Sequence, residues 1–364
     1  MLQETRWSGT CQWARPSATG AIIMDGNAVT DASAKTNVDI VLEGGGVKGI
    51  ALVGALRELC AAHTVQRVAG TSAGAIVAAL LAAGYTIPEL EREMRSLDFA
   101  SFEDRPARHF RKVGATLAVL LHNGVFKGDA LHTWIEERLA DKNVTTFQQL
   151  RRQEAGDDTG TSPYKLAVVV SDISRGRELH LPEDYRALCG VDPDTAKVAD
   201  AVRASASIPF YFRPVRFRTG PSLESQRLVF VDGGLLSNFP VGLFDRRGAT
   251  PPRWPTIGIK LSMRRTPSQQ WQPARNPVEL ARRLVSTMTS AHDRIHVDQS
   301  SVQDRTIFVD TDKVRSTDFR ISQEQVEMLY ANGRSAAQQF LATWDFQQWL
   351  NRYHLSRGVP GTPP

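Results

Sequence analysis

The sequence predicts an α/β fold with three layers, in which a mainly parallel central sheet is covered by helices on both faces. Short apolar segments typical of buried strands alternate along the chain with longer segments of helical apolar spacing. Glycine clusters stand at the junctions between strand and helix. At 364 residues, with 41% hydrophobic and 23% charged residues, the chain can bury the core that such a fold needs.

The domain organisation predicted from composition is a single domain over residues 37–345. No stretch rich in Pro, Gly and Ser interrupts this range as a linker would. The motifs described below define a core at about 38–262, and a helical C-terminal part follows at 277–345. Residues 1–36 are small and polar without sustained periodicity, which predicts a mobile arm, and residues 346–364 are expected to form a C-terminal tail.

The first two strand–helix units follow one another directly. Val38–Leu42 is expected to be a buried strand, the glycines at 44 to 46 end it, and Val47–Ala62 has helical apolar spacing. Val65–Ala69 is expected to be the second strand. After a tight turn, Ala73–Ala83 is predicted to form an almost wholly apolar helix.

The remainder of the chain continues the alternation of strands and helices. Four further strands are expected, at Lys165–Val170, Leu228–Val231, Thr256–Leu261 and Thr306–Val309. Helices are expected at Ala196–Ser205, Pro277–His296 and Ser322–Leu341. Because such alternation favours a largely parallel sheet, we expect functional residues where strands end and helices begin.

The net charge of +5 would mildly favour anionic surfaces such as acidic phospholipid. The basic residues are dispersed, and no Lys/Arg block is interleaved with aromatic residues, so nucleic acid is not expected as a partner. The segment Ala21–Met24 is too short for a signal-peptide core, and no apolar stretch reaches the length of a membrane span. We therefore expect a cytoplasmic protein that can act at the periphery of a membrane.

The segment Gly70-Thr71-Ser72-Ala73-Gly74 matches the pattern G-x-S-x-G and lies between a predicted strand and a predicted helix. A serine at such a bend is held in a strained backbone conformation that lifts its hydroxyl above the sheet. The following helix directs its free N–H groups towards that serine, which stabilises negative charge developing in acyl transfer. Ser72 is thus a candidate nucleophile and the Ala73 N–H a candidate oxyanion donor, although a serine here could also simply cap the helix.

The glycine loop before it supports two alternative functions. Gly44-Gly45-Gly46-Val47-Lys48-Gly49 satisfies G-x-G-x-x-G, so a nucleotide-binding protein using this loop is one alternative. A Rossmann site also requires an acidic residue after the second strand, and here that strand continues into the serine turn. With Ser72 nearby, bare amides of Gly44, Gly45 and Gly46 can instead form an oxyanion hole, with the charge of Lys48 close by.

A serine nucleophile needs a base. Asp232 is the strongest candidate, because the strand Leu228–Val231 leads directly into it and Gly233 and Gly234 follow, which allows another loop to approach its carboxylate. An ordinary Asp-Gly turn would look the same. A second possibility is an α/β-hydrolase esterase with a Ser72, Asp232, His292 triad, because these residues follow the chain order of that class.

These three motifs in this order closely resemble the patatin-like phospholipase family. The resemblance extends to Ser171–Gly176, Ala204–Phe210 and Asn238–Pro240, and it covers roughly residues 38 to 262. It implies a patatin-like fold and hydrolysis of fatty acyl esters of phospholipids and related lipids. This sequence departs from the family pattern in having Lys48 where Arg is frequent and Gly234 where Ala is frequent.

The resemblance also implies a site. Ser72 would be the nucleophile and Asp232 its base, in a two-residue dyad that uses neither histidine, metal nor cofactor. Gly44, Gly45, Gly46 and Ala73 would form the oxyanion hole. The residues expected to support them within the same motifs are Val47, Lys48, Gly49, Gly70, Thr71, Gly74, Gly233 and Gly234.

One apolar segment lies between the motifs. Residues 113–121 are strongly apolar and follow a basic stretch at 105–112. The segment could be buried core, or a lid that contacts lipid, in which case charges at Leu117 and Leu120 would weaken binding to liposomes.

Overall fold

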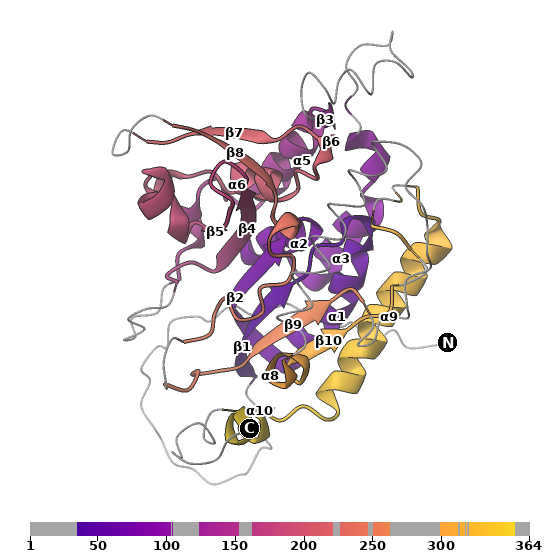
Figure 1. The fold of residues 1–364 in the computed structure, drawn as a ribbon. Helices are drawn as coiled ribbons and strands as arrows, with labels where there is room; N and C mark the ends of the chain where they lie inside the picture. Colours follow the sequence, from indigo (N-terminus) through magenta and orange to yellow (C-terminus); the bar gives the residue numbers. More distant parts are fainter. Residues whose placement is uncertain are drawn as a thin grey trace, which may run out of the picture.

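The computed structural model describes residues 35–102, 104, 124–152, 162–220, 226–246, 250–262, 299–311, 314–316, 318 and 320–353. In the folded molecule these residues are built around a central sheet (Figure 1). Its eight strands are β1 (Thr36–Leu42), β2 (His63–Thr71), β4 (Leu166–Asp172), β5 (Arg177–Leu181), β7 (Val215–Arg218), β8 (Arg227–Asp232), β9 (Thr256–Lys260) and β10 (Thr306–Phe308). A separate pair joins β3 (Gly124–Phe126) and β6 (Phe210–Phe212).

Helices cover the sheet, which confirms the predicted α/β class. They are α1 (Gly49–Ala62), α2 (Ala73–Ala82), α3 (Ile87–Ser96), α5 (Asp129–Ala140), α6 (Val198–Ser205), α8 (Ser300–Gln303), α9 (Gln323–Leu341) and α10 (Phe346–Tyr353). The helix expected from Val47 starts instead with a short 3-10 helix, and α1 begins at Gly49. The helix expected at Pro277–His296 lies outside the described residues.

The strands alternate their side chains between two apolar layers. On β1, Ile40 and Leu42 belong to the larger core, which also contains the buried side chains of α1 and α2. Val41 points to the opposite face and packs in a smaller cluster with Phe239 and Val302. Because both faces of the central strands are buried, these strands have the almost continuous apolar sequences from which they were predicted.

Sheet order explains how distant segments meet. The order is β10-β9-β1-β2-β4-β8-β7, with β5 also paired to β4. The strands from β10 to β4 run parallel, as expected, whereas β5, β7 and β8 join by antiparallel pairing. The sheet is therefore mixed, and its antiparallel part was not predicted.

Two strands share one edge of β4. Strand β2 occupies that edge up to the pair between Thr71 and Val169, where it ends. Strand β5 pairs with the other edge, so β8 must take the edge that β2 leaves free, beginning with the pair between Asp232 and Val170. Because β2 and β8 approach from opposite directions, the residues at their C-terminal ends meet head-on.

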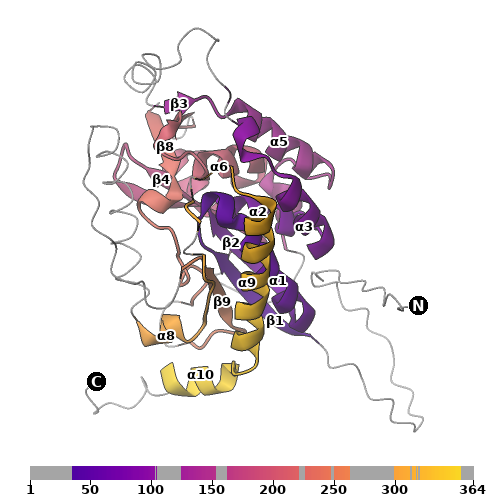
Figure 2. The ribbon, with the colours of Figure 1, turned by 90° about the vertical axis from the view of Figure 1, so that its right-hand side faces the viewer.

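The C-terminal helices belong to the folded body. Helix α9 lies along α1 (Figures 1 and 2), and its start is capped by Ser322, whose hydroxyl accepts a hydrogen bond from the Gln325 N–H. Residues 346–353, expected to belong to a C-terminal tail, form α10 instead. Trp349 explains this difference, because its ring is buried and its indole N–H donates to the Ser301 carbonyl.

Candidate active site

Ser72 lies at the turn between β2 and α2. Its backbone has φ 53° and ψ −121°, a left-handed value that a serine rarely adopts. A side chain at either flanking glycine would collide with backbone, because a Cβ at Gly70 would lie 2.2 Å from the Gly74 carbonyl oxygen and one at Gly74 2.5 Å from that of Leu42. The strained turn therefore requires both glycines of the motif.

Asp232 meets Ser72 at the shared edge of β4. The Ser72 hydroxyl donates to Oδ2 of Asp232 at 2.6 Å, across 160 positions of sequence. The other carboxylate oxygen accepts the Gly234 N–H at 2.8 Å. Both residues are buried, and burial raises the pKa of Asp232 to about 6, against the lowering effect of these two hydrogen bonds. A Cβ at Gly233 would lie 2.3 Å from the Val169 carbonyl oxygen, so the close approach requires glycine there.

Ser205, the last residue of α6, and Ser207 hold the pair in place. The Ser205 hydroxyl accepts the Ser72 N–H at 2.9 Å and donates to the Val169 carbonyl at 2.6 Å. The Ser207 carbonyl accepts the Asp232 N–H at 2.9 Å. Both serines lie in the segment 204–210, which the sequence singled out as a motif but to which it assigned no role.

The glycine loop lies directly against Ser72. A Cβ at Gly44 would be 3.2 Å from the Ser72 Cβ and 2.3 Å from the Asn238 side-chain oxygen. The Gly44 N–H donates to the Asn238 carbonyl at 3.3 Å, so this amide, one of the four expected oxyanion donors, is already engaged. Within the described part of the chain, the N–H groups of Gly45, Gly46 and Ala73 have no hydrogen-bond acceptor.

A buried polar network fixes the glycine loop. The Asn238 side-chain amide donates to the Gly44 carbonyl at 3.2 Å and to the Glu43 carboxylate at 3.3 Å. The same carboxylate pairs with the Lys260 ammonium and accepts the Leu261 N–H. No sequence pattern pointed to Glu43 or Lys260, although Asn238 stood in a motif. The ammonium of Lys48 donates to the Thr311 hydroxyl at 3.0 Å.

A narrow apolar pocket adjoins Ser72. Gly46, Ser72 and Ala73 are among the residues that line it, and its volume is about 30 Å³. This is roughly the volume that one water molecule occupies in the liquid. The apolar side chains that line the rest of it are Ile76, Phe102, Leu131, Ala206, Ile208 and Phe212. A fatty acyl chain would fit beside Ser72 only after some of these side chains move apart.

Other expected features lie elsewhere or outside the described residues. His292 and the apolar segment 113–121 fall outside them. Within the described residues, no group of three or more His, Cys, Asp or Glu side chains could hold a metal ion. Nor is any helix among them long and apolar enough to cross a membrane.

Comparison with known proteins assigns the class. The model of the family "Patatin-like phospholipase" matches residues 40–245, which include both Ser72 and Asp232. The chain belongs to this family, and that membership supports hydrolase activity on lipids.

Particular relatives come from bacteria and viruses. The uncharacterized protein YqhO of Bacillus subtilis (strain 168) is 35% identical over 85% of this chain and 99% of that protein. The probable lipid hydrolase 463L of Invertebrate iridescent virus 6 is 23% identical over 56% of this chain and 62% of its own. The crystal structure of VipD from Legionella pneumophila aligns with a TM-score of 0.48 at 18% identity, over 85% of this chain and 68% of that one.

Proposed function

We propose that this protein hydrolyses fatty acyl esters of phospholipids with a Ser72–Asp232 dyad, through an acyl-serine intermediate. The observation that carries the proposal is the 2.6 Å hydrogen bond from the Ser72 hydroxyl to a buried carboxylate, on a strained turn at the start of a helix. Membership of the patatin-like phospholipase family supports the substrate class.

The dyad works by coupled proton transfer and attack. Asp232 takes the hydroxyl proton as the Ser72 oxygen bonds to the ester carbonyl carbon, which leaves a tetrahedral oxyanion. The N–H groups of Gly45, Gly46 and Ala73 stabilise that charge, together with the N-terminus of α2. Collapse of the oxyanion expels the alcohol of the lysolipid, which takes the proton back from Asp232. Water then hydrolyses the acyl-serine in the same manner.

Two alternative functions are less well supported. In a Ser-His-Asp triad an imidazole stands between serine and carboxylate, but here the two oxygens are 2.6 Å apart, which leaves no room for His292 between them. A nucleotide-binding loop needs open space before its backbone for a pyrophosphate. Here Gly44 packs against Ser72 and Asn238, which favours an oxyanion site.

Phospholipids are presented at a membrane surface, so we further propose transient contact with one. Phe210 is an exposed aromatic residue, 37% accessible, that stands two positions from the pocket residues Ile208 and Phe212. Its φ of 67° is unusual for a bulky side chain. An exposed aromatic side chain on a strained backbone, so close in sequence to two pocket residues, supports insertion of this segment into the lipid interface.

The test compares variants on mixed phospholipid vesicles, with mass spectrometry of released fatty acids and lysolipids. Ser72→Ala and Asp232→Asn should each lower turnover at least about a thousandfold, because nucleophile and base act as a unit. A fluorophosphonate probe should label the native serine and not Ser72→Ala. As matched controls, Ser335→Ala and Asp192→Asn change exposed residues and should retain activity. Residual turnover above one tenth in either folded dyad variant would contradict the proposal.

A further inference from the structure

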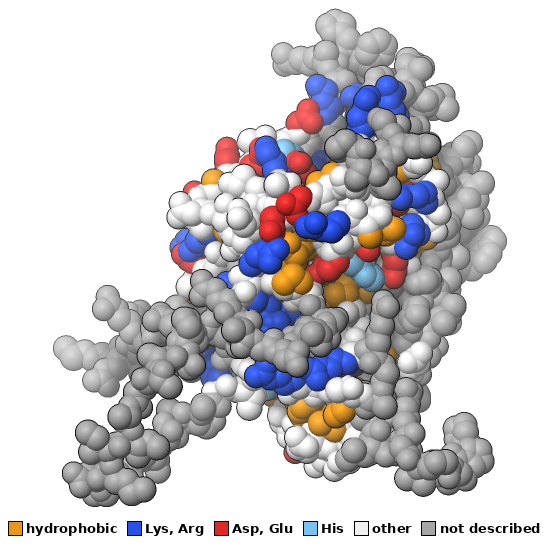
Figure 3. Space-filling view, turned by 90° about the vertical axis from the view of Figure 1, so that its left-hand side faces the viewer, with side chains coloured by type: hydrophobic (Ala, Val, Ile, Leu, Met, Phe, Trp, Pro, Cys, Tyr) orange, Lys and Arg blue, Asp and Glu red, His pale blue; other side chains and the backbone are white. Residues whose placement is uncertain are grey.

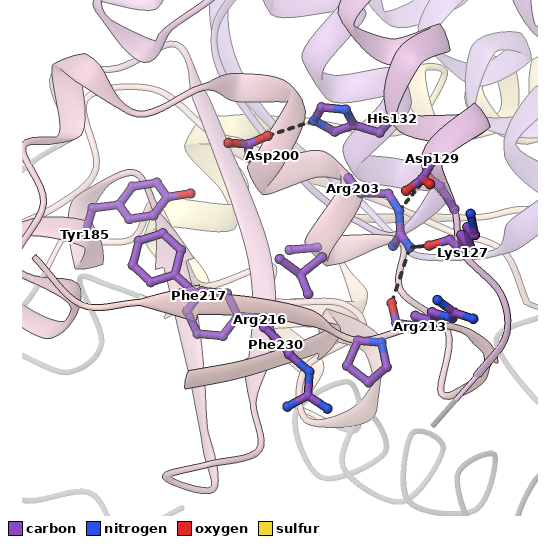
Figure 4. Close-up of a pocket in the computed structure, with 14 residues that line it drawn as sticks. Lys127, Asp129, His132, Tyr185, Asp200, Arg203, Arg213, Arg216, Phe217 and Phe230 are labelled. Atoms are coloured by element: carbon purple, nitrogen blue, oxygen red, sulfur yellow. Dashed lines mark hydrogen bonds and ion pairs between the residues drawn. The ribbon is translucent and has the colours of Figure 1, made fainter. Parts of the chain in front are cut away.

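A second, larger cavity lies apart from the pocket at Ser72. Its volume is about 600 Å³, well within the range of small-molecule sites. Figure 4 shows it between the start of α5, helix α6 and the β7–β8 ribbon. Neither Ser72 nor Asp232 lines it, so the proposed reaction leaves this cavity without an assigned role.

The charges that line the cavity are unbalanced. Four basic side chains stand in its wall, and they are Lys127, Arg203, Arg213 and Arg216. Only two acidic side chains accompany them, Asp129 and Asp200. The Asp200 carboxylate is already engaged, because it lies 2.7 Å from the His132 ring nitrogen. The cavity therefore presents net positive charge to its contents.

Arg203 is buried, and all its hydrogen bonds go to neutral groups. Its guanidinium donates to the carbonyls of Lys127, Gly128 and Arg213 and to the Ser207 hydroxyl, all of them neutral acceptors. No carboxylate in the described residues forms an ion pair with it. Burial lowers the pKa of Arg203 to about 10, so the group remains charged at neutral pH. The nearby carboxylates of Asp104 and Asp129 favour its charged form without pairing with it directly, so an anion beside Arg203 would stabilise the buried charge further.

Arg213 has a side-chain N–H donor without a hydrogen-bond acceptor among the described residues. Its Nε is buried and has no hydrogen-bond acceptor in the structure. The other nitrogens of this guanidinium also donate to no acceptor in the described residues, so the side chain keeps donors for a bound group. Lys127 also forms no ion pair with the described residues, so two cationic side chains remain available to one ligand.

We propose that this cavity binds the phosphate group of a phosphate-bearing ligand, held by Lys127 and Arg213 beside the buried charge of Arg203. Guanidinium groups match phosphate geometry through paired N–H donors, and lysine adds a point charge. The apolar side of the cavity, formed by Val215, Phe217 and Phe230, would hold the ligand's organic part.

The cavity is connected to the proposed dyad by a few hydrogen bonds. Arg203 donates to the Ser207 hydroxyl, and the Ser207 carbonyl accepts the Asp232 N–H. Ser205 holds the Ser72 N–H from the same segment. A phosphate drawn towards Arg203 would therefore act on the segment that positions both residues. This coupling rests on the proposed function, whereas phosphate binding itself does not.

Calorimetry with inorganic phosphate and with sn-glycerol 3-phosphate tests the binding. Titration of Ser72→Ala separates binding from turnover, so the result stands whether or not the dyad is catalytic. We expect saturable binding of at least one of these probes, weakened about tenfold by Arg213→Gln and by Lys127→Gln, since a charge-assisted hydrogen bond contributes about 1.5–3 kcal/mol.

Arg218→Gln is the matched control. It removes the same kind of charge as Arg213→Gln, from an exposed position on β7 that does not line the cavity. Arg218→Gln should bind the phosphate probes with the same affinity as the parent protein. The proposal is overturned if neither probe binds saturably, if the control weakens binding as much as Arg213→Gln, or if both cavity variants, shown to be folded by circular dichroism, bind normally.

Kinetics then distinguish the source of the phosphate. If the occupant is a separate ligand, glycerol 3-phosphate should change the rate on p-nitrophenyl butyrate, an ester without phosphate, and Arg213→Gln should abolish that change. If the occupant is the lipid headgroup, glycerol 3-phosphate should compete with phospholipid alone, and Arg213→Gln should raise KM for phospholipid but not for the simple ester. Binding without either effect would overturn the coupling to the dyad.

Discussion

The backbone of Ser72 is strained, and the proposed acyl transfer would make use of that conformation. A positive φ at a non-glycine residue costs on the order of 1–3 kcal/mol and persists only where the surroundings impose it. Here the flanking glycines permit the tight turn, and Ser205 and Asp232 hold the backbone N–H and the hydroxyl. The strain keeps the hydroxyl at the start of α2, where the helix dipole favours a developing oxyanion.

The raised pKa of Asp232 predicts the pH dependence of activity. Only the carboxylate form can accept the Ser72 proton, so kcat/KM on a neutral soluble ester should rise as pH increases through about 6 and then level off. Below about pH 6, the logarithm of kcat/KM should rise with pH with a slope of one, because one group titrates. The measurement is kcat/KM from pH 4.5 to 8, with circular dichroism at each pH to show that the fold persists. A profile that is flat down to pH 4.5 would contradict the assignment of the base.

The raised pKa of Asp232 also makes folding stability depend on pH. Activity should increase with pH, whereas this contribution to stability decreases with pH. Because folding raises the pKa of Asp232 above its usual 3.8, the protonated carboxyl favours the folded state. That contribution is fully present below pH 3.8 and is lost as pH rises through about 6. Burial of the Asp232 carboxylate therefore costs stability near neutral pH, where the proposed mechanism needs it ionised.

The sequence alone pointed to the two residues of the proposed dyad but not to the residues that hold them in place. Ser72 and Asp232 stand in short motifs whose glycines have a physical reason to be there. Ser205 holds the Ser72 N–H from 133 positions away, and the motif in which it stands gives no sign of that contact. The engaged amide of Gly44 depends likewise on the fold around Asn238, which a motif cannot convey.

At the scale of elements, strands were predicted more reliably than their directions. The apolar segment at 228–231 predicted β8, but pairing direction depends on the strand before it, β7, whose four residues alternate only partly buried and exposed side chains. Such a short pattern is too weak to be recognised. Yet this antiparallel return is what allows β8 to continue along the edge of β4 that β2 leaves, and so brings Asp232 to Ser72.

The contact between α1 and α9 depends on two glycines. A Cβ at Gly333 would lie 2.0 Å from the Ala51 carbonyl oxygen, and one at Gly54 2.2 Å from that of Tyr330. In an unconstrained helix, Gly→Ala stabilises by about 1 kcal/mol. Here we expect Gly333→Ala to lower the free energy of unfolding by roughly 1–3 kcal/mol, because the helices must separate.

Urea denaturation measures that change. Ser335→Ala provides the reference, because it lies on the same helix with its side chain exposed and should alter stability by less than about 0.5 kcal/mol. A Gly333→Ala protein more stable than its parent would show that the two helices are not in close contact.

At the scale of the whole molecule, surface charge is mixed. On the face shown in Figure 3, Lys and Arg side chains lie among Asp and Glu side chains over the upper part of the described surface. This agrees with the dispersed basic residues seen in the sequence, despite the net charge of +5. Positive charge is concentrated instead inside the cavity beside α6, which composition could not predict, because its basic residues come from separate segments.

The family match ends at residue 245, but the sheet does not. Strand β9 pairs with β1 on the edge opposite to β2, and β10 extends the sheet beyond it. Helix α9 covers α1, whose side chains Leu52 and Leu56 are wholly buried. We therefore expect a chain of residues 35–250 to be insoluble or unfolded, because it leaves the edge of β1 and one side of α1 exposed.

A chain of residues 35–353 is the matched control, since it retains every described element. It should be soluble, unfold in one cooperative transition, and keep the ester hydrolysis of the full chain. Expression, circular dichroism and thermal denaturation of both chains test this expectation. Should residues 35–250 fold and hydrolyse esters at the full rate, β9, β10 and α9 would be accessory to a smaller core. Failure of the short chain alone would instead show that the dyad depends on a sheet completed by segments outside the family motifs.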